Sequence, residues 1–320
     1  MDFLKRINTK AKTDDNTGFG SNSSNYGGRF LSKNGNANVR KDGIGFLESI
    51  SWYHTMLNIP RWKFLFIVLL FYVVVNLFFA ILYYLIGVEH LNGITAVTNL
   101  EKFGQAYFFS VQTYTTVGYG HINPTGFLAS FVSSIEALIG LLTFAIATGL
   151  FYGRFSRPSA FVRFSENAII APYKGGKALM FRIAPYKNTN LVDAEAKLTA
   201  GISVEENGVI VNKFYSLPLE MERISALTLS WTVVHPINEE SPLYAFKETD
   251  YKNMQGEFLV FFKTFEDMYS STVVKRTSYT FDEVVYDAKF LPMFTRNIQN
   301  DKTILHLDKL NAFEKVSLNT

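Results

Sequence analysis

The stretch Thr115-Thr-Val-Gly-Tyr-Gly120 lies between two apolar runs, 64–86 and 127–151, and each run is long enough to cross a bilayer. Its two glycines, Gly118 and Gly120, can take the positive φ values that turn successive backbone carbonyls toward one axis, a conformation that a Cβ would penalise. Carbonyls turned in this way, together with a threonine hydroxyl, replace the water shell of a dehydrated cation. The stretch therefore predicts an ion filter, and the flanking runs predict a membrane-spanning pore.

Within this stretch, the five residues TVGYG are the established sequence of potassium filters. A chance match to five specified positions is on the order of one in ten thousand for a chain of 320 residues, and the flanking runs supply the structural context that such a motif requires. The predicted filter residues are Thr116, Val117, Gly118, Tyr119 and Gly120, and we expect potassium to bind at the first four of them, from Thr116 to Tyr119.

Composition separates a membrane part from a soluble part and excludes several classes of protein. Of the 320 residues, 48% are hydrophobic and 16% aromatic, and the apolar residues concentrate in the first half. The net charge of +3 is too small and too scattered for a nucleic-acid partner. The absence of cysteine excludes disulfides, cysteine metal sites and a thiol nucleophile. No nucleophile and base pair or phosphate-binding loop stands out, so we expect no enzyme and no cofactor beyond the permeant potassium ion.

The first 60 residues fall into two segments. Residues 1–43 are rich in Asn, Ser, Gly, Lys and Asp and have no sustained apolar period, which predicts a disordered tail. From 44 to 60, apolar residues recur at helical spacing until Pro60, which predicts an interfacial helix. Residues typical of membrane-interface anchors cluster at Trp52, Arg61, Trp62 and Lys63, and this favours an interfacial helix over an amphipathic helix of a soluble domain.

Residues 61–158 are predicted to form a pore domain, which contains two spans and a short helix between them. The first span, 64–86, is interrupted only by Asn76, and the second is 127–151. Residues 101–114 are apolar and helix-like but too short to cross, so we expect a re-entrant pore helix that leads into the filter. Ten Lys and Arg residues precede the first span and only one lies between the spans, so the positive-inside rule places both termini in the cytoplasm.

The sequence after Pro158 is that of a soluble β-domain, 159–320. Its short apolar runs are separated by Gly, Asn, Pro and charged clusters, and they lie at 178–183, 227–234, 257–262 and 272–281. Runs of this length and spacing predict an all-β sandwich that is large enough to bury its own core.

The order of interfacial helix, span, pore helix, filter, span and β-domain resembles the inward-rectifier potassium channels, and among them the prokaryotic KirBac type. The resemblance is carried by IEALIG at 135–140, GLFYGRFSRP at 149–158, WTVVHPI at 231–237 and RTSY at 276–279. It implies a two-span α-helical membrane pore with a re-entrant pore helix, followed by a cytoplasmic all-β immunoglobulin-like sandwich that extends the ion path. It also implies a homotetramer in a bacterial inner membrane, with gating coupled through the interfacial helix and modulated by anionic lipids. The missing cysteines agree with the prokaryotic branch.

Three residues near the predicted filter depart from the family pattern. Gln112 stands where the family usually has an acid behind the filter, His121 where prokaryotic members usually have Asp after it, and Phe144 where strongly rectifying members have a cavity acid. Four copies of His121 would form a titratable ring at the outer mouth. Glu136 lies within the second span, where an ionised carboxylate without a partner costs about 2.5–3.5 kcal/mol. We expect Glu136 either to hydrogen-bond behind the filter with groups such as Gln112 or to act directly on permeation.

The second span also carries the predicted cavity and gate. Phe144, Thr148 and Tyr152 follow one another at intervals of four residues and share one helical stripe. The resemblance implies that this stripe lines the cavity and that Tyr152, nearest the cytoplasm, forms the narrowest ring; packing against lipid is the alternative. Because the stripe has no carboxylate, we expect only weak block by intracellular polyamines or Mg²⁺.

Charged residues indicate two further sites. Asp267 falls where the family has a pore-facing acid in the cytoplasmic vestibule, and Glu205 and Glu206 are weaker candidates for that role, the alternative being solvated acids at a strand end or turn. Lipid phosphates are expected at the basic residues that flank the spans, with topology alone as the alternative; these residues are Arg61, Lys63, Arg154, Arg157 and Arg163.

The sequence thus predicts a potassium-selective channel of the inward-rectifier type, which carries potassium passively. Two alternatives stay open. One is a less selective cation channel of the same architecture, against which the intact TVGYG argues. The other is a two-span membrane tether whose β-domain binds a partner and which conducts nothing; a tether has no need of a filter or a re-entrant helix.

Overall fold

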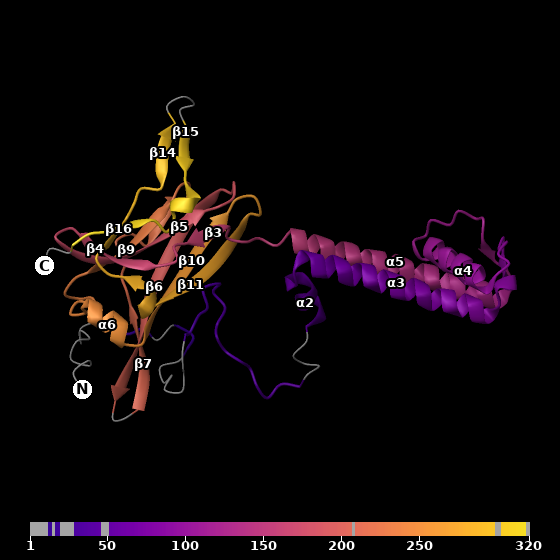
Figure 1. Ribbon diagram of the computed structural model, residues 1–320, viewed down its shortest axis with the longest axis horizontal. Helices are drawn as coiled ribbons and strands as arrows, with labels where there is room; N and C mark the ends of the chain where they lie inside the picture. The colour runs from indigo at the N-terminus through magenta and orange to yellow at the C-terminus, as the bar shows by residue number, and fades with distance from the viewer. Residues whose placement is uncertain are drawn as a thin grey trace. The chain divides into compact units, whose positions relative to one another are not determined.

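The computed structural model describes residues 12–14, 17–19, 29–45, 51–206, 209–297 and 302–317, without the side chains of 204–210 and 297. The protein divides into two compact units. One is Asp42–Arg157 and is mainly helical, and the other combines Met1–Lys41 with Pro158–Thr320 and is mainly β-sheet (Figure 1).

Two long helices dominate the first unit, α3 (Arg61–Ile86) and α5 (Phe127–Phe155). Both are long and apolar enough to cross a membrane, with mean hydropathy of 2.9 and 1.9 in their most apolar stretches. Their large apolar side chains are mostly exposed, as expected of helices that face lipid or further copies of the chain. The two predicted spans are confirmed, although α3 begins three residues before 64 and α5 ends four residues after 151.

The shorter helix α4 (Asn99–Tyr114) packs against both α3 and α5 (Figure 1). It begins with a capping box between Thr98 and Glu101, which satisfies two free amides at the helix start. The 3₁₀ turn η2 (Val88–His90) and the paired strands β1 (Leu91–Asn92) and β2 (Asn123–Pro124) complete the connections. The predicted re-entrant helix is therefore present as an independent element between the spans.

The predicted interfacial helix is shorter than expected where it is described. Helix α2 runs over Trp52–Asn58 and is capped by the Ser51 hydroxyl, which accepts from the His54 amide. Residues 44–45 are not helical, and 46–50 lie outside the described residues. Pro60 directly precedes α3, in accord with its predicted role as the end of the interfacial segment.

The β-domain contains two five-stranded sheets (Figure 1). The first has the order β11-β10-β6-β7, with β8 also on β6: β11 (Ser271–Thr280), β10 (Gly256–Glu266), β6 (Leu191–Glu206), β7 (Val209–Ser216) and β8 (Arg223–Ala226). The second has the order β12-β4-β5-β3, with β9 also on β5: β12 (Val284–Val285), β4 (Ala168–Tyr173), β5 (Gly176–Pro185), β3 (Val162–Phe164) and β9 (Trp231–Ile237). All the pairs are antiparallel except β12 with β4.

One continuous core joins the two sheets. Strand β9 shows why, because its side chains alternate, with Trp231, Val233 and Ile237 buried. They meet inward-facing residues of the other sheet, such as Phe258 and Phe262 of β10. The predicted all-β sandwich is confirmed.

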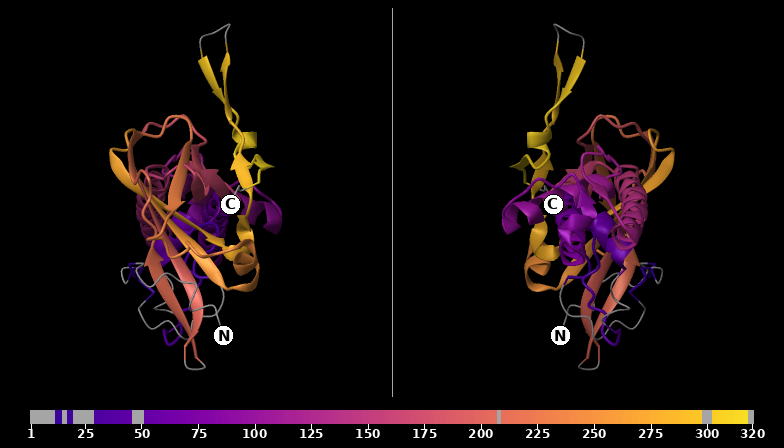
Figure 2. Two further views of the ribbon diagram at one scale, coloured as in Figure 1. Left: turned by 90° about the vertical axis from the view of Figure 1, so that its left-hand side faces the viewer. Right: turned by 90° about the vertical axis from the view of Figure 1, so that its right-hand side faces the viewer.

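Short helices and strands of the C-terminal part pack around the sandwich or project from it. These are α6 (Glu248–Asn253), η3 (Phe281–Glu283), β13 (Ala288–Phe290), β14 (Phe294–Asn297), β15 (Lys302–Leu305), η4 (Leu307–Lys309) and β16 (Phe313–Lys315). Strands β13 and β16 pair with each other, and β14 and β15 form a hairpin that projects from the sandwich (Figure 2).

The prediction of a disordered tail over 1–43 is wrong for residues 29–38. A bridge between Leu31 and Ala37 closes a small hairpin there, and Phe30 and Leu31 are buried against Phe214 and Leu259 of the β-domain. The tail composition lacks periodicity because this hairpin is stabilised by distant partners and not by local pattern. Residues 1–11, 15–16 and 20–28 lie outside the described residues.

Candidate functional site: the filter and its supports

Helix α4 delivers the chain directly into the filter. The carbonyl of Gln112, in the last turn of α4, accepts from the amides of Val117 at 2.9 Å and Gly118 at 3.3 Å. The Thr115 hydroxyl donates to the Val111 carbonyl at 2.7 Å. The otherwise free carbonyls at the helix end thus hold the first filter residues, and the negative end of the helix dipole lies beside them, where it favours a cation.

The backbone φ angles of the filter residues alternate between positive and negative values. Thr116, Gly118 and Gly120 have φ values of 59°, 54° and 80°, so every second residue is left-handed. Alternation of this kind turns successive carbonyls to the same side of the strand, which is the arrangement that a carbonyl-lined cation path requires. Positive φ was predicted for the glycines and is observed. The same conformation at Thr116, which costs a residue with a Cβ about 1–2 kcal/mol, was not predicted.

In a single chain the filter faces open space. All the residues from Thr115 to Gly120 are exposed, and the Tyr119 ring is 79% exposed. Irregular backbone at membrane depth is stable only when it is enclosed by protein or lines a watery path. One copy therefore supplies one wall of a site that other copies must complete.

A buried acid joins three helices behind the filter. Glu136 of α5 is fully buried, and its two carboxylate oxygens accept from the Ser110 hydroxyl of α4 and the Tyr83 hydroxyl of α3, each at 2.5 Å. Ser110 also lies 3.2 Å from the side-chain oxygen of Asn76. The expected partner Gln112 takes no part in this network. Sequence reasoning missed Tyr83 and Ser110, although Asn76, the single polar residue in the first predicted span, was a signal.

Helix α5 also touches the end of the pore helix directly. A Cβ built on Gly140 would overlap the backbone carbonyl of Tyr114, so no side chain fits between the two helices at this point. The family-like segment at 135–140 thus places Glu136 and Gly140, one helical turn apart, against the same pore helix.

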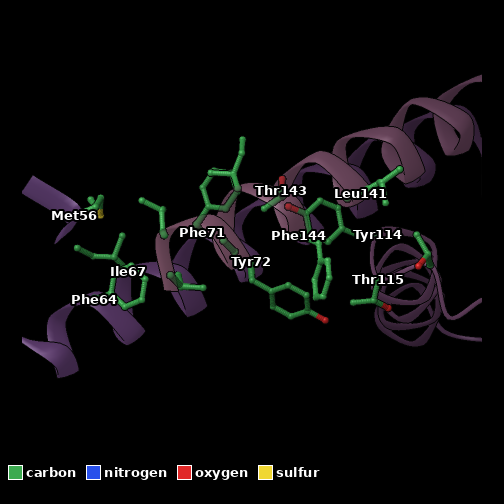
Figure 3. A pocket seen from close by; sticks show the side chains of 16 residues that line it. Met56, Phe64, Ile67, Phe71, Tyr72, Tyr114, Thr115, Leu141, Thr143 and Phe144 are labelled. Carbon is green, nitrogen blue, oxygen red and sulfur yellow. The ribbon is translucent and has the colours of Figure 1, made fainter. Parts of the chain in front are cut away.

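The predicted cavity stripe lies on an open face of α5. Phe144 and Tyr152 are 73% and 74% exposed, and the Thr148 hydroxyl donates back to the Phe144 carbonyl at 2.8 Å. An apolar groove of about 580 Å³ runs from this face to the start of the filter (Figure 3). Figure 3 shows that Phe144 and Thr115 border the same groove, opposite Tyr72 of α3.

The C-terminal end of α5 is bonded to α2. Arg154 donates to the Met56 carbonyl at 2.8 Å and to the Ile59 carbonyl, and its guanidinium lies 4.9 Å from the Phe64 ring centre. Arg157 donates to the Asn58 side chain. Two of the predicted lipid-binding residues are therefore engaged with the C-terminal end of a helix, where a cation is favourable. Arg61 and Lys63 are exposed, as Arg157 is.

Models of two protein families match this chain. Residues 31–158 match the inward rectifier potassium channel transmembrane domain, and residues 162–320 match the inward rectifier potassium channel C-terminal domain. The chain belongs to the inward-rectifier potassium channel family. It is thus a potassium channel of the membrane and not an enzyme, as the sequence predicted.

Relatives of the channel occur in bacteria and animals. The chain is 33% identical to the inward rectifier potassium channel Kirbac3.1 of Paramagnetospirillum magnetotacticum, with 88% of this chain and 95% of the relative covered. It is 26% identical to irk-1 of Caenorhabditis elegans and 28% identical to the G protein-activated inward rectifier potassium channel 1 of Homo sapiens, with 89% and 83% of this chain covered. The chain spans only 56% and 58% of those two animal proteins.

The side chain of one of the three predicted cytoplasmic acids, Asp267, lies within the described part of the chain. Asp267 is exposed in the turn between β10 and β11, where the Asn190 amide lies 3.5 Å from its carboxylate. Glu205 and Glu206 lie at the end of β6, and their side chains lie outside the described part of the chain. His121, predicted at the outer mouth, is exposed, and its carbonyl borders Gly93.

Arg163 belongs to a basic and aromatic platform at the start of the channel's β-domain. Its guanidinium lies 5.1 Å from the Tyr186 ring centre, and Lys187 lies 3.9 Å from the ring centre of Phe161. Lys275 donates to the Val162 carbonyl, and burial, with Arg163 beside it, lowers the pKa of Lys275. No carboxylate among the described residues pairs with these three cations. Sequence reasoning missed Lys187 and Lys275, because they lie far from the spans in sequence.

Proposed function

We propose that four copies of this channel surround one axis, dehydrate potassium in the filter and carry it passively and selectively across a bacterial inner membrane. The observation that carries the proposal is the alternating backbone of Thr116, Gly118 and Gly120, which is exposed in one chain. Four such walls supply rings of carbonyls, with potassium bound from Thr116 to Tyr119. The basic residues before α3 and after α5 support cytoplasmic termini.

The gate in this proposal is a ring of four Tyr152 side chains, with Phe144 and Thr148 lining the cavity above it. The exposed stripe on α5 supports this assignment, since most of the surface of Phe144 and Tyr152 is open to a cavity shared with other copies. Aromatic constrictions close a pore by excluding water. The bonds from Arg154 and Arg157 to α2 couple any displacement of that helix to the gate.

Anionic lipid is the proposed modulator. The candidate lipid-binding residues still include Arg61, Lys63 and Arg163. We add two lysines near Arg163, Lys187 and Lys275, because these three cations have no carboxylate partner among the described residues. Basic residues near an anionic surface gain about 1 kcal/mol each. In this proposal Arg154 and Arg157 hydrogen-bond to the end of α2 and do not serve primarily to bind lipid phosphate.

The voltage at which current reverses in a planar bilayer tests the function. With high potassium and low sodium on one side and the reverse on the other, the proposed channel gives a current that reverses near the potassium equilibrium potential. A less selective cation channel would reverse near zero, and a tether would give no current above that of protein-free bilayers. Either of these results would contradict the proposal.

A further inference from the structure

The segment that follows the filter is paired with the segment that follows α3. Strand β2 is antiparallel to β1, and Asn123 lies directly opposite Asn92. Two residues further along, the Thr125 amide donates to the His90 carbonyl at 2.7 Å. The two paired segments are here called the clamp, residues 90–94 and 121–125. Because the clamp begins at the residue directly after Gly120, it fixes the chain where the filter ends.

Gly93 brings the two segments of the clamp into direct contact. Its φ is 96°, and a Cβ built on it would overlap the His121 carbonyl. Gly104 of α4 is different, because a Cβ there would meet only open space. Since His121 directly follows Gly120, its carbonyl can keep this position only if residue 93 has no side chain. Gly93 thus determines where the backbone lies as it leaves the filter.

The clamp packs on the same helices that support the other end of the filter. Leu91 is 3% exposed, and Ile94 and Ile122 pack beside it. These apolar side chains belong to one cluster with residues of α3 and α4, which are Phe79, Tyr83, Ala106 and Phe109. Helix α4 also holds the first filter residues through the Gln112 carbonyl. The filter is therefore held at both ends by one set of packed elements.

Support at both ends matters because the filter backbone is strained. Sparsely populated backbone conformations persist only where the surrounding structure over-determines them, and Thr116, at φ 59°, has such a conformation. A binding site must also hold its ligand atoms to within about 0.5 Å. We propose that the clamp holds the C-terminal end of the filter in the conformation that binds potassium, and that Gly93 is a positioning residue for selectivity. The inference rests on the proposed channel function, because it concerns the support of that same filter.

Thermal unfolding of the purified channel in rising potassium measures potassium binding without flux, with N-methylglucamine added to keep the ionic strength constant. A ligand that binds only the folded protein raises the midpoint. Gly93→Ala should need about tenfold more potassium than the wild type for the same rise, because the new Cβ displaces the His121 carbonyl. Gly104→Ala is the matched control and should keep the wild-type requirement. An unchanged requirement in Gly93→Ala would overturn the role of Gly93.

A disulfide tests the pairing of the clamp itself, because the chain has no cysteine of its own. Directly opposite residues of an antiparallel pair have Cα atoms about 4.5–5.5 Å apart, within the range of about 4.4–6.8 Å that a disulfide needs. Asn92→Cys with Asn123→Cys should therefore oxidise readily within one chain, as read by peptide mass. Asn92→Cys with Thr125→Cys is the shifted control and should oxidise much more slowly. Equal rates for the two pairs would overturn the pairing.

Ile122→Ala loosens the clamp without an overlap, and it takes the place of Gly93→Ala if that variant does not fold. Its potassium requirement should rise by about threefold or more, and oxidation of cysteines at 92 and 123 in the same chain should restore the wild-type requirement. A loss of packing alone would lower every midpoint and leave the requirement unchanged. A raised requirement that persists after oxidation would contradict the proposal.

Rubidium uptake into liposomes then tests selectivity. Uptake by Gly93→Ala or Ile122→Ala should fall when sodium is added, whereas wild-type uptake should not. A raised potassium requirement without this response to sodium would refute the role in selectivity. If the wild type neither takes up rubidium nor is stabilised by potassium, the proposed channel function fails and the inference with it. Oxidation of the cysteine pair would still decide whether the clamp pairs as described.

Discussion

Single residues in this channel occupy two unusual environments. Thr116 takes a left-handed conformation that costs about 1–2 kcal/mol, and the bonds from Val117 and Gly118 to the Gln112 carbonyl help to offset that cost. His235 is buried in β9, where its ring nitrogens contact the Pro218 carbonyl at 2.6 Å and the Ser241 hydroxyl at 2.8 Å. In the first case the strain serves the ion path. In the second, burial in the core favours the neutral form of an ionisable group.

Protonation of His235 should therefore make the stability of the channel's β-domain depend on pH. Burial lowers the pKa of His235 to about 4. The unfolded chain binds a proton near the ordinary value of about 6.5, so acidification from about pH 6.5 to about pH 4 favours unfolding, by up to about 3 kcal/mol. Thermal unfolding of the purified channel across this range measures the effect. His235→Gln should flatten this part of the profile, whereas His306→Gln should leave it unchanged; a steep profile in His235→Gln would disprove the assignment.

At the scale of elements, the sequence predicted the helices better than their contacts. Spans, pore helix and filter follow from local apolar runs and from the glycines of TVGYG. The support of the filter does not, because Glu136 meets Ser110 and Tyr83, which lie 26 and 53 residues away in the chain. Gln112 was expected as the partner on the basis of family position alone. Helix packing decides which of the candidate polar groups can reach the buried acid.

Removal of one partner of Glu136 should weaken the packing of α3, α4 and α5. Ser110→Ala or Tyr83→Phe leaves one carboxylate oxygen buried without its donor, which costs about 1–3 kcal/mol. The thermal midpoint of the purified channel should fall in both variants. Ser134→Ala is a suitable control, since the Ser134 hydroxyl donates only to the Ser130 carbonyl of its own helix at 2.8 Å. Equal midpoints for the wild type and both variants would show that the network adds nothing to stability.

On the scale of the whole molecule, the sequence predicted a pore domain and a β-sandwich, and both are present. The ordered hairpin at 29–38 was missed because these residues have a tail-like composition, and the acids that bind it, Glu257 and Glu283, follow more than 220 residues later. Lys275 was missed for a similar reason, because the sandwich fold places it at the Tyr186 ring, which Arg163 also contacts. Long-range pairs of charged residues leave no period in the sequence.

Block of the channel by cytoplasmic polyamines should be weak. The exposed stripe of α5 presents Phe144, Thr148 and Tyr152, with no carboxylate, so a blocker that stops near Asp267 crosses little of the membrane field. Full crossing would contribute about 2.3 kcal/mol per charge per 100 mV. A spermine titration from the cytoplasmic side should show shallow block, steep block in Phe144→Asp and weaker block in Asp267→Asn. Strong, steeply voltage-dependent block of the wild type would contradict this account.

The central claim is that the backbone of Thr116 to Gly120 selects potassium, and rubidium uptake into liposomes tests it most directly. Uptake by the purified wild type should be suppressed by added potassium and unaffected by sodium, since the carbonyl rings replace the hydration shell of the larger ion. Gly118→Ala, which places a Cβ on a residue at φ 54°, should lose this discrimination. Wild-type protein that admits sodium and potassium equally would contradict the account.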